Sequence, residues 1–144
     1  MFVVNVEGAI RRNGQWLLIR RSEKEEHAGG TLSLVGGRCE AEGFASDILE
    51  KTLHREIFEE VGCEVTDLHY VNSSSFVSDS GVHVIDIVFL CRHKSGEPYC
   101  KSSDEVDQVL CRTTEEIIND MNLPGFLREN ISLAAKLLKG QGLE

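Results

Sequence analysis

The chain has 144 residues, 41% of them hydrophobic, which suits one domain over residues 1–144 built around a single core. Its formal net charge of −9 at pH 7 argues against a nucleic-acid-binding or anionic-membrane surface, because proteins that bind phosphate backbones normally present a basic stripe. No apolar run approaches the roughly 18 residues of a membrane span, and the first residues lack the basic region of a signal peptide, so we expect a cytoplasmic protein without nucleic-acid or membrane partners.

The first half of the chain predicts three strands and one helix. Residues 3–10 and 16–21 are rich in β-branched and apolar side chains, and Arg12-Asn13-Gly14 between them predicts a hairpin turn. The charged residues 22–30 end in two glycines and predict a mobile loop, followed by a short strand over residues 31–34. An amphipathic helix is then predicted over residues 47–61, because apolar side chains recur there every four residues. These are Leu49, Leu53, Ile57 and Val61.

The second half predicts three more strands, over residues 64–76, 82–93 and 105–112. A capping-box pattern that begins at Thr113 predicts a short helix, and residues 126–139 predict a terminal helix. One apolar stripe runs along that last helix: Leu127, Ile131, Ala134 and Leu138. Helices on either side of a mixed β-sheet make an α/β/α sandwich, so we assign the chain to the α/β class.

The cysteines do not form a disulfide or zinc-binding pattern. They are five in number and are never spaced as Cys-x-x-Cys. Cys63, Cys91 and Cys111 lie in or beside apolar runs, and we predict that they are small core residues.

Residues 55–63, Arg-Glu-Ile-Phe-Glu-Glu-Val-Gly-Cys, place three carboxylates on one side of the predicted helix. Glu56, Glu59 and Glu60 fall within an arc of roughly 100°, and no cation shares that arc. Like charges at this spacing each destabilise a helix by a few tenths of a kcal/mol. A bound Mg²⁺ or Mn²⁺, which prefers oxygen ligands, would convert the repulsion into coordination. The alternative is an acidic helix face that is merely solvated.

The surroundings of this helix resemble the sequence box of the Nudix hydrolases. Gly36-Gly37 close an apolar stretch, seven residues separate Asp47 from Arg55, Arg55 precedes Glu56, and Gly62 follows the glutamates. Two departures accompany the match. The spacer between Gly37 and Asp47 is four residues longer than in the family, so Glu40 and Glu42 compete with Asp47 for any role of a loop carboxylate. Val35 replaces the proline that usually precedes the turn at the two glycines.

The resemblance implies the Nudix fold and a metal-dependent pyrophosphohydrolase. Its substrate would be a nucleoside diphosphate linked to another group, in the class of nucleoside triphosphates, ADP-ribose or nucleotide sugars. Mg²⁺, with Mn²⁺ as a substitute, would be held by Glu56, Glu59, Glu60 and the carbonyl of Gly36. Arg55 would orient a glutamate, and one glutamate or a loop acid would act as the general base. The alternative is a catalytically silent Nudix-fold module that binds nucleotides or regulates another protein.

Further residues extend the expected site. The family often supplies another acid near the C-terminal third, where Glu105 is the best match and Asp104 and Glu97 compete. Arg21 and Gly37 are assigned to substrate binding, with Arg20 on the opposite face of its strand and with a solvent role for both arginines as the alternative. His54 lies opposite the acidic arc and is expected at the surface. The segment after the box, residues 76–80, matches no substrate-specific signature of the family. A nucleotide-derived small molecule is the expected partner, and a homodimer is kept open as the assembly.

Overall fold

The strand β1 (Phe2–Arg12) is the centre of the sheet in this computed structural model, which describes residues 1–25 and 29–142. One edge of β1 pairs in parallel with β6 (His83–Ser95). The other edge is divided between two partners, because Asn5 to Gly8 pair with β4 (Val35–Arg38) and Ile10 to Arg12 pair with β2 (Gln15–Arg21). The pairings of β1 with β4 and with β2 are antiparallel, whereas its pairing with β6 is parallel, so the sheet is mixed.

The remaining strands extend this arrangement to seven strands. β5 (Glu64–Val77) pairs with β6 and lies at the far edge, while β3 (Leu32–Ser33) and β7 (Val106–Arg112) both pair with β2. The predicted hairpin between β1 and β2 is confirmed. Its two turn residues, Asn13 and Gly14, have φ of 51° and 75°, the left-handed values that a two-residue type I′ turn requires.

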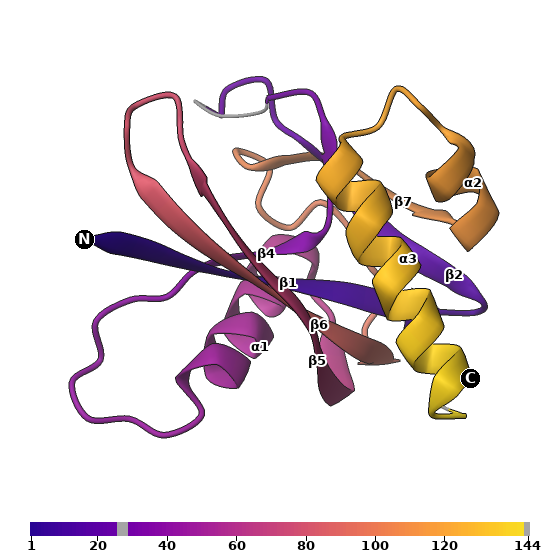
Figure 1. Cartoon of the computed structure of the whole chain (residues 1–144), viewed down its shortest axis with the longest axis horizontal. Coiled ribbons are helices and arrows are strands. Elements are labelled where there is room, and N and C mark those ends of the chain that lie inside the picture. Colours follow the sequence, from indigo (N-terminus) through magenta and orange to yellow (C-terminus); the bar gives the residue numbers. More distant parts are fainter. Residues whose placement is uncertain (26–28, 143–144) are drawn as a thin grey trace.

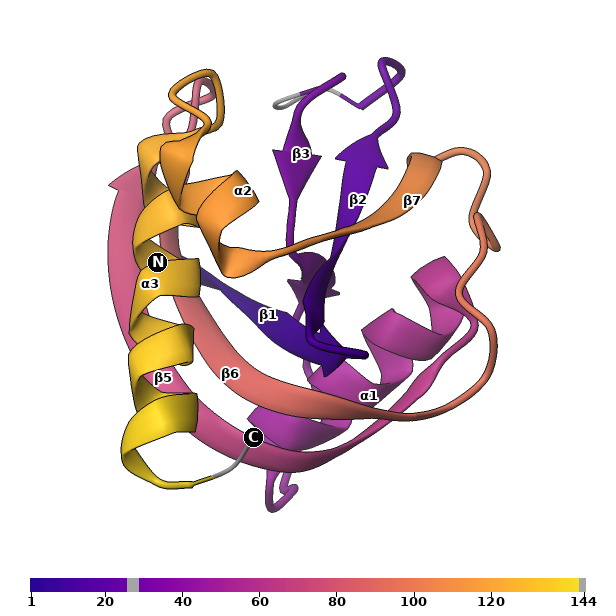
Figure 2. The same ribbon diagram turned by 90° about the vertical axis from the view of Figure 1, so that its right-hand side faces the viewer.

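Helices cover both faces of the sheet (Figures 1 and 2). The helix α1 (Ile48–Val61) packs on one face, and α2 (Thr114–Asn119) and α3 (Gly125–Gly140) pack on the other. Alternation along β2 divides the core between the two layers, since Leu17 and Ile19 face α1 whereas Trp16 and Leu18 face α3. The predicted α/β/α sandwich around a mixed sheet is therefore confirmed.

The predicted contacts of the helices hold in detail. Leu127, Ile131, Ala134 and Leu138 of α3 are all buried, as the apolar stripe predicted. The capping box of α2 is present, because Thr113 Oγ1 accepts from the backbone of Glu116 and the Glu116 carboxylate accepts from the backbone of Thr113.

The three cysteines that we predicted to be core residues lie in or against the core. Cys63 and Cys91 are buried, and Cys111 packs against the core while partly exposed.

The segment around the two glycines departs from the prediction. We expected one strand over residues 31–34 and then a turn at Gly36-Gly37, but the structure has β3 followed by β4, which contains both glycines. The turn assignment was wrong because the backbone of β4 pairs with β1, a long-range contact that local turn preferences do not reveal. The helix boundaries differ by one residue, since Asp47 caps α1 and does not belong to it. The last strand also differs by one residue, since we expected it to begin at Glu105 and β7 begins at Val106. The expected loop at residues 22–30 lies partly outside the described residues.

No helix in the described ranges, 1–25 and 29–142, is long and apolar enough to cross a membrane.

Replacing Ile131 with alanine should lower the free energy of unfolding by about 2–5 kcal/mol, because its side chain is fully buried between α3 and the sheet. Lys136→Ala, on the exposed side of the same helix, should change it by less than about 0.5 kcal/mol. Urea unfolding of both variants followed by circular dichroism measures the difference. Equal losses would mean that α3 does not cover the core as described.

Candidate active site

The three carboxylates of the acidic arc lie in three different environments on α1. Glu60 is 4% exposed, Glu56 is half-buried and Glu59 is exposed. The helix that carries them begins after Asp47, which has a left-handed backbone (φ 55°) and makes no capping hydrogen bond with its side chain. It ends at Gly62, whose φ of 72° suits glycine. The three glutamate side chains therefore range from exposed to buried, so the acidic arc is not uniformly solvated.

The Glu60 carboxylate is buried beside the strand β4. Its Oε1 accepts a hydrogen bond of 3.2 Å from the backbone N–H of Gly36. Burial is the main cause that raises the pKa of Glu60 to about 8, and the negative charges of Glu105 and Glu56 add to it. The Gly36 N–H and the Arg21 guanidinium act in the opposite direction without cancelling the effect. A carboxyl group in this position favours either a proton or a bound cation.

Both glycines of β4 are required by close approach. A Cβ at Gly36 would collide with the backbone of Val6 and Glu7 in β1, and a Cβ at Gly37 would collide with the Glu56 carboxylate. The two positions thus let α1 and β1 approach the same short strand from two sides. We expected the Gly36 carbonyl to face the site, whereas the contact that the structure shows from this residue to a glutamate is made by its amide.

Arg55 connects the carboxylates to the loop before α1. Its guanidinium lies 3.5 Å from Glu56 Oε1 and 3.4 Å from Glu40 Oε2, and it donates to the carbonyl of Arg38 at 3.2 Å. Burial raises the pKa of Glu56 to about 7, while the positive charge of Arg55 lowers it. This geometry agrees with a role in orienting Glu56.

Among the three competing distal acids, Glu105 is the one that acts on the glutamates of α1. Its charge raises the pKa of both Glu56 and Glu60. It accepts a 3.1 Å hydrogen bond from Ser102 Oγ and is otherwise exposed. Asp104 instead lies 3.9 Å from Lys24, and Glu97 pairs with Arg12 at 2.7 Å. His54 is exposed, as predicted.

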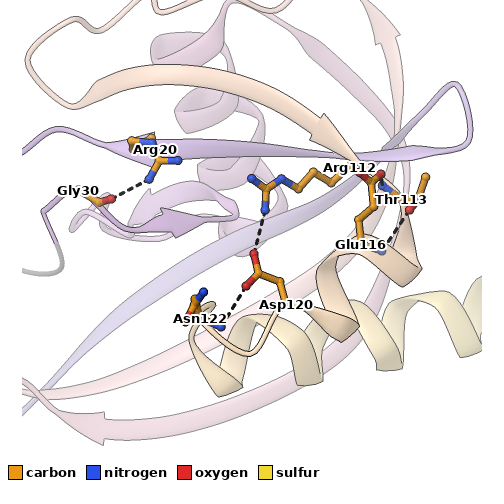
Figure 3. Close-up of polar contacts among 7 residues, drawn as sticks. All are labelled: Arg20, Gly30, Arg112, Thr113, Glu116, Asp120 and Asn122. Carbon is orange, nitrogen blue, oxygen red and sulfur yellow. Dashed lines mark hydrogen bonds and ion pairs between the residues drawn. The ribbon is translucent and has the colours of Figure 1, made fainter.

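The two neighbouring arginines at the end of β2 have different surroundings. The charge of Arg21 lowers the pKa of Glu60, which places it within electrostatic reach of the acidic site, and it lies 3.6 Å from Glu25. Arg20 donates to the carbonyl of Gly30 at 3.0 Å, as Figure 3 shows, and to Gln108 at 3.1 Å. It lines a hollow of about 400 Å³ with Arg112 and Asp120, which are 3.3 Å apart.

Sequence analysis missed one pair of acids near this site, Glu7 of β1 and Asp86 of β6. Asp86 is 5% exposed, and burial is the main cause that raises the pKa of both groups, with their mutual hydrogen bond as a further cause for Glu7. The signal was available, because a Glu and an Asp each stand among apolar residues of their strands, and an acid at such a position is rarely buried without a partner.

The donor set fits a hard divalent cation. Carboxylate oxygens are the ligands that Mg²⁺ and Mn²⁺ prefer, and burial with neighbouring acids raises the pKa of Glu56 and Glu60 although Arg55 and Arg21 act in the opposite direction. Among residues 1–25 and 29–142, no three acidic, His or Cys side chains converge closely enough to hold a metal ion by themselves. Mg²⁺ is commonly bound by one or two carboxylates together with waters and substrate phosphates, which matches this open arrangement.

Comparison with known proteins identifies the family. The NUDIX domain matches residues 1–131. A NAD-capped RNA hydrolase NudC from Mannheimia succiniciproducens is 33% identical over 91 residues, which are 62% of this chain and 32% of that protein. The chain thus spans about a third of that relative's length.

Solved structures agree on the fold. A MutT protein from Methanosarcina mazei has a TM-score of 0.78 at 25% identity, with 96% of each chain covered. A MutT NUDIX hydrolase from Burkholderia pseudomallei has a TM-score of 0.78 at 24% identity, covering 92% of this chain and 98% of its own. The acidic helix beside the two glycines and the match over residues 1–131 place the chain in the Nudix hydrolase family, whose members cleave phosphoric anhydride bonds.

Proposed function

We propose that the chain is a divalent-metal-dependent pyrophosphohydrolase that cleaves the diphosphate linkage of a nucleoside diphosphate joined to another group. The observation that carries the proposal is the buried Glu60 carboxylate, which accepts a hydrogen bond from Gly36 and lies near the charges of Glu56 and Glu105. A purely structural helix gains nothing from burying an acid among other acids, whereas a site that binds a cation and phosphates does.

We assign each residue of the site a role that fits its position and exposure. Glu56, Glu59 and Glu60 would hold the cation, and Arg55 keeps Glu56 in place. When bound, Mg²⁺ or Mn²⁺ would neutralise charge on the diphosphate and help to activate water. Arg21 supplies a positive charge for the phosphates, and Gly37 leaves space beside Glu56. The general base is an exposed carboxylate, Glu59 or Glu105, because a base must reach the attacking water.

The family suggests the class of substrate. We infer a nucleoside triphosphate, ADP-ribose or a nucleotide sugar, and the NudC relative adds NAD-capped RNA to the compounds worth testing. The five free thiols agree with a reducing, cytoplasmic location. A homodimer stays a prediction. The second candidate function is a silent nucleotide-binding module, which retention of all three glutamates of α1 disfavours.

Phosphate release should depend on divalent cations. With Mg²⁺ present, at least one compound from a panel of nucleoside triphosphates, ADP-ribose, nucleotide sugars, dinucleoside polyphosphates and NAD-capped RNA should be hydrolysed. Excess EDTA should abolish the reaction and added Mg²⁺ should restore it, because the carboxylates need the cation to approach a polyanion. Unchanged turnover in EDTA would refute the metal-dependent mechanism, and binding without turnover would favour the silent module.

Glu60→Gln should lower kcat by at least roughly 10²-fold, about 2.7 kcal/mol, because it removes one anionic oxygen from the expected metal site. Folding should survive, since the variant removes a carboxyl group that is costly to bury. The matched control is Glu115→Gln at an exposed position of α2, which should change kcat by less than about threefold. Kinetics at saturating Mg²⁺ compare the two, and equal effects would overturn the assignment.

Binding of Mg²⁺ should strengthen as the pH rises from about 6 to about 8.5, since Glu56 and Glu60 must lose protons to hold a cation. Their pKa values of about 7 and about 8 in the metal-free protein exceed the ordinary 4.5. Their protonated forms therefore stabilise the metal-free fold fully below about pH 4.5, and this stabilisation is lost as the pH rises through about 7 to 8.

Thermal unfolding with and without Mg²⁺ at both pH values tests this expectation. The increase in Tm caused by Mg²⁺ should be larger at about pH 8.5, while the metal-free protein of Glu60→Gln should lose less stability than wild type over the same interval. An increase in Tm that is the same at both pH values would contradict the assignment of these carboxylates to the cation.

A further inference from the structure

The hollow of about 400 Å³ beside Arg20 is lined by β2, β3, β7 and the loop between α2 and α3. Two arginines, one aspartate, one asparagine and two leucines are among its lining residues: Arg20, Arg112, Asp120, Asn122, Leu32 and Leu123. Its volume is within the roughly 300–1,000 Å³ that small-molecule sites occupy. None of these residues belongs to the acidic site, so the hollow needs an account of its own.

The register of the strands places the hollow on the opposite face of β2 from the acidic site. Arg20 follows Trp16 by four residues, so the alternation of a strand places both side chains on one face, and Trp16 packs in the α3 layer. Arg112 is the direct partner of Trp16 and faces the same side. Arg21 instead pairs with Val106, which packs in the α1 layer. The two adjacent arginines of β2 therefore face different sites.

Arg20 is held at the hollow without being neutralised. Its Nη1 donates to the carbonyl of Gly30 at 3.0 Å (Figure 3), and its Nε donates to the side-chain oxygen of Gln108 at 3.1 Å. Both acceptors are uncharged, and in the described part of the chain no carboxylate forms an ion pair with Arg20. A guanidinium group held in this way keeps its positive charge and is oriented before a ligand arrives.

The carboxylate of Asp120 has both of its oxygens occupied. Its Oδ2 lies 3.3 Å from Nη1 of Arg112, and its Oδ1 accepts from the backbone N–H of Asn122 at 3.0 Å, as Figure 3 shows. Nη2 of Arg112 and the side-chain amide of Asn122 donate to no residue in the ranges 1–25 and 29–142. Among the described lining residues, two guanidinium groups thus face one carboxylate, which leaves positive charge and N–H donors for an anionic ligand.

A phosphate group suits these donors. Guanidinium groups bind phosphate through paired hydrogen bonds, and a phosphate has enough oxygens to accept from Arg20, Arg112 and Asn122 together. Leu32 and Leu123 line the same hollow, so there is apolar surface for an organic group that carries the phosphate.

We propose that this hollow is a second ligand site, which binds the phosphate group of a small molecule through Arg20, Arg112 and Asn122. The site is distinct from the acidic site, where Arg21 and a cation would meet the diphosphate. The inference does not depend on the proposed function, because phosphate can bind here in a protein that hydrolyses nothing.

Inorganic phosphate is the first probe. It is titrated into ¹⁵N-labelled protein in EDTA at constant ionic strength, so that no divalent cation carries it to the acidic site. Two-dimensional NMR should show saturable shifts of the amide signals of residues 30–32 and 120–123, which line the hollow. Absence of saturable shifts would overturn the proposal. Shifts confined to residues 36–37 and 55–60 would also overturn it, because they would assign the phosphate to the acidic site.

Substitutions assign the binding to the two guanidinium groups. Arg20→Gln and Arg112→Gln should each raise the Kd for phosphate by about tenfold or more, because each removes a charged donor. Arg92→Gln is the matched control, since Arg92 also pairs with an aspartate, Asp67, but lies outside the hollow. Both Arg92→Gln and Arg21→Gln should keep the Kd within about twofold of wild type.

Two results with these variants would contradict the proposal. The first is wild-type affinity for phosphate in folded Arg20→Gln and Arg112→Gln, with folding judged by circular dichroism. The second, which applies even where Arg112→Gln does not fold, is loss of binding in Arg21→Gln together with wild-type affinity in Arg20→Gln.

The kinetics of Arg112→Gln identify the source of the phosphate group. If it belongs to a remote part of the substrate, KM should rise by about tenfold with kcat little changed. If it belongs to a separate molecule, KM should stay at the wild-type value, while the increase in Tm that phosphate causes in the metal-free protein should be lost. A variant that keeps both the KM and this increase in Tm would refute the site. Failure to hydrolyse any nucleotide would refute the proposed function alone.

Discussion

The burial of the Glu60 carboxylate against the backbone of β4 is the constraint on which the site depends. A carboxyl group that is 4% exposed, with one hydrogen bond from Gly36 and two acids nearby, favours a proton or a cation over an isolated negative charge. The fold reaches this state only because β4 carries no side chains at Gly36 and Gly37. Any Cβ there would push β4 away from β1 or displace Glu56.

The same short strand, β4, adjoins both the carboxylates of α1 and the strand β1. On one side it receives the carboxylates of α1, and on the other it pairs with β1 at Glu7. The division of the β1 edge between β4 and β2 places Asn5 to Gly8 of β1 beside the strand that carries Gly36 and Gly37.

Much of the fold was predictable because it follows from local patterns. The Asn13-Gly14 turn, the capping box of α2 and the apolar stripe of α3 each depend on residues a few positions apart, and the structure confirms all three. The location of Glu56, Glu59 and Glu60 on one side of α1 follows in the same way from the geometry of a helix. Strand β4 was missed because its pairing with β1 joins segments about thirty residues apart.

By itself, the sequence determined which side chains α1 presents together, since helical periodicity needs no knowledge of the remaining chain. Only the tertiary structure decided that Glu60 is buried while Glu59 is exposed, that Glu105 and not Asp104 or Glu97 acts on them, and that Glu7 meets Asp86. The reason is physical. Burial, desolvation and the distance between charges depend on which segments pack together, and those contacts form between residues far apart in the chain.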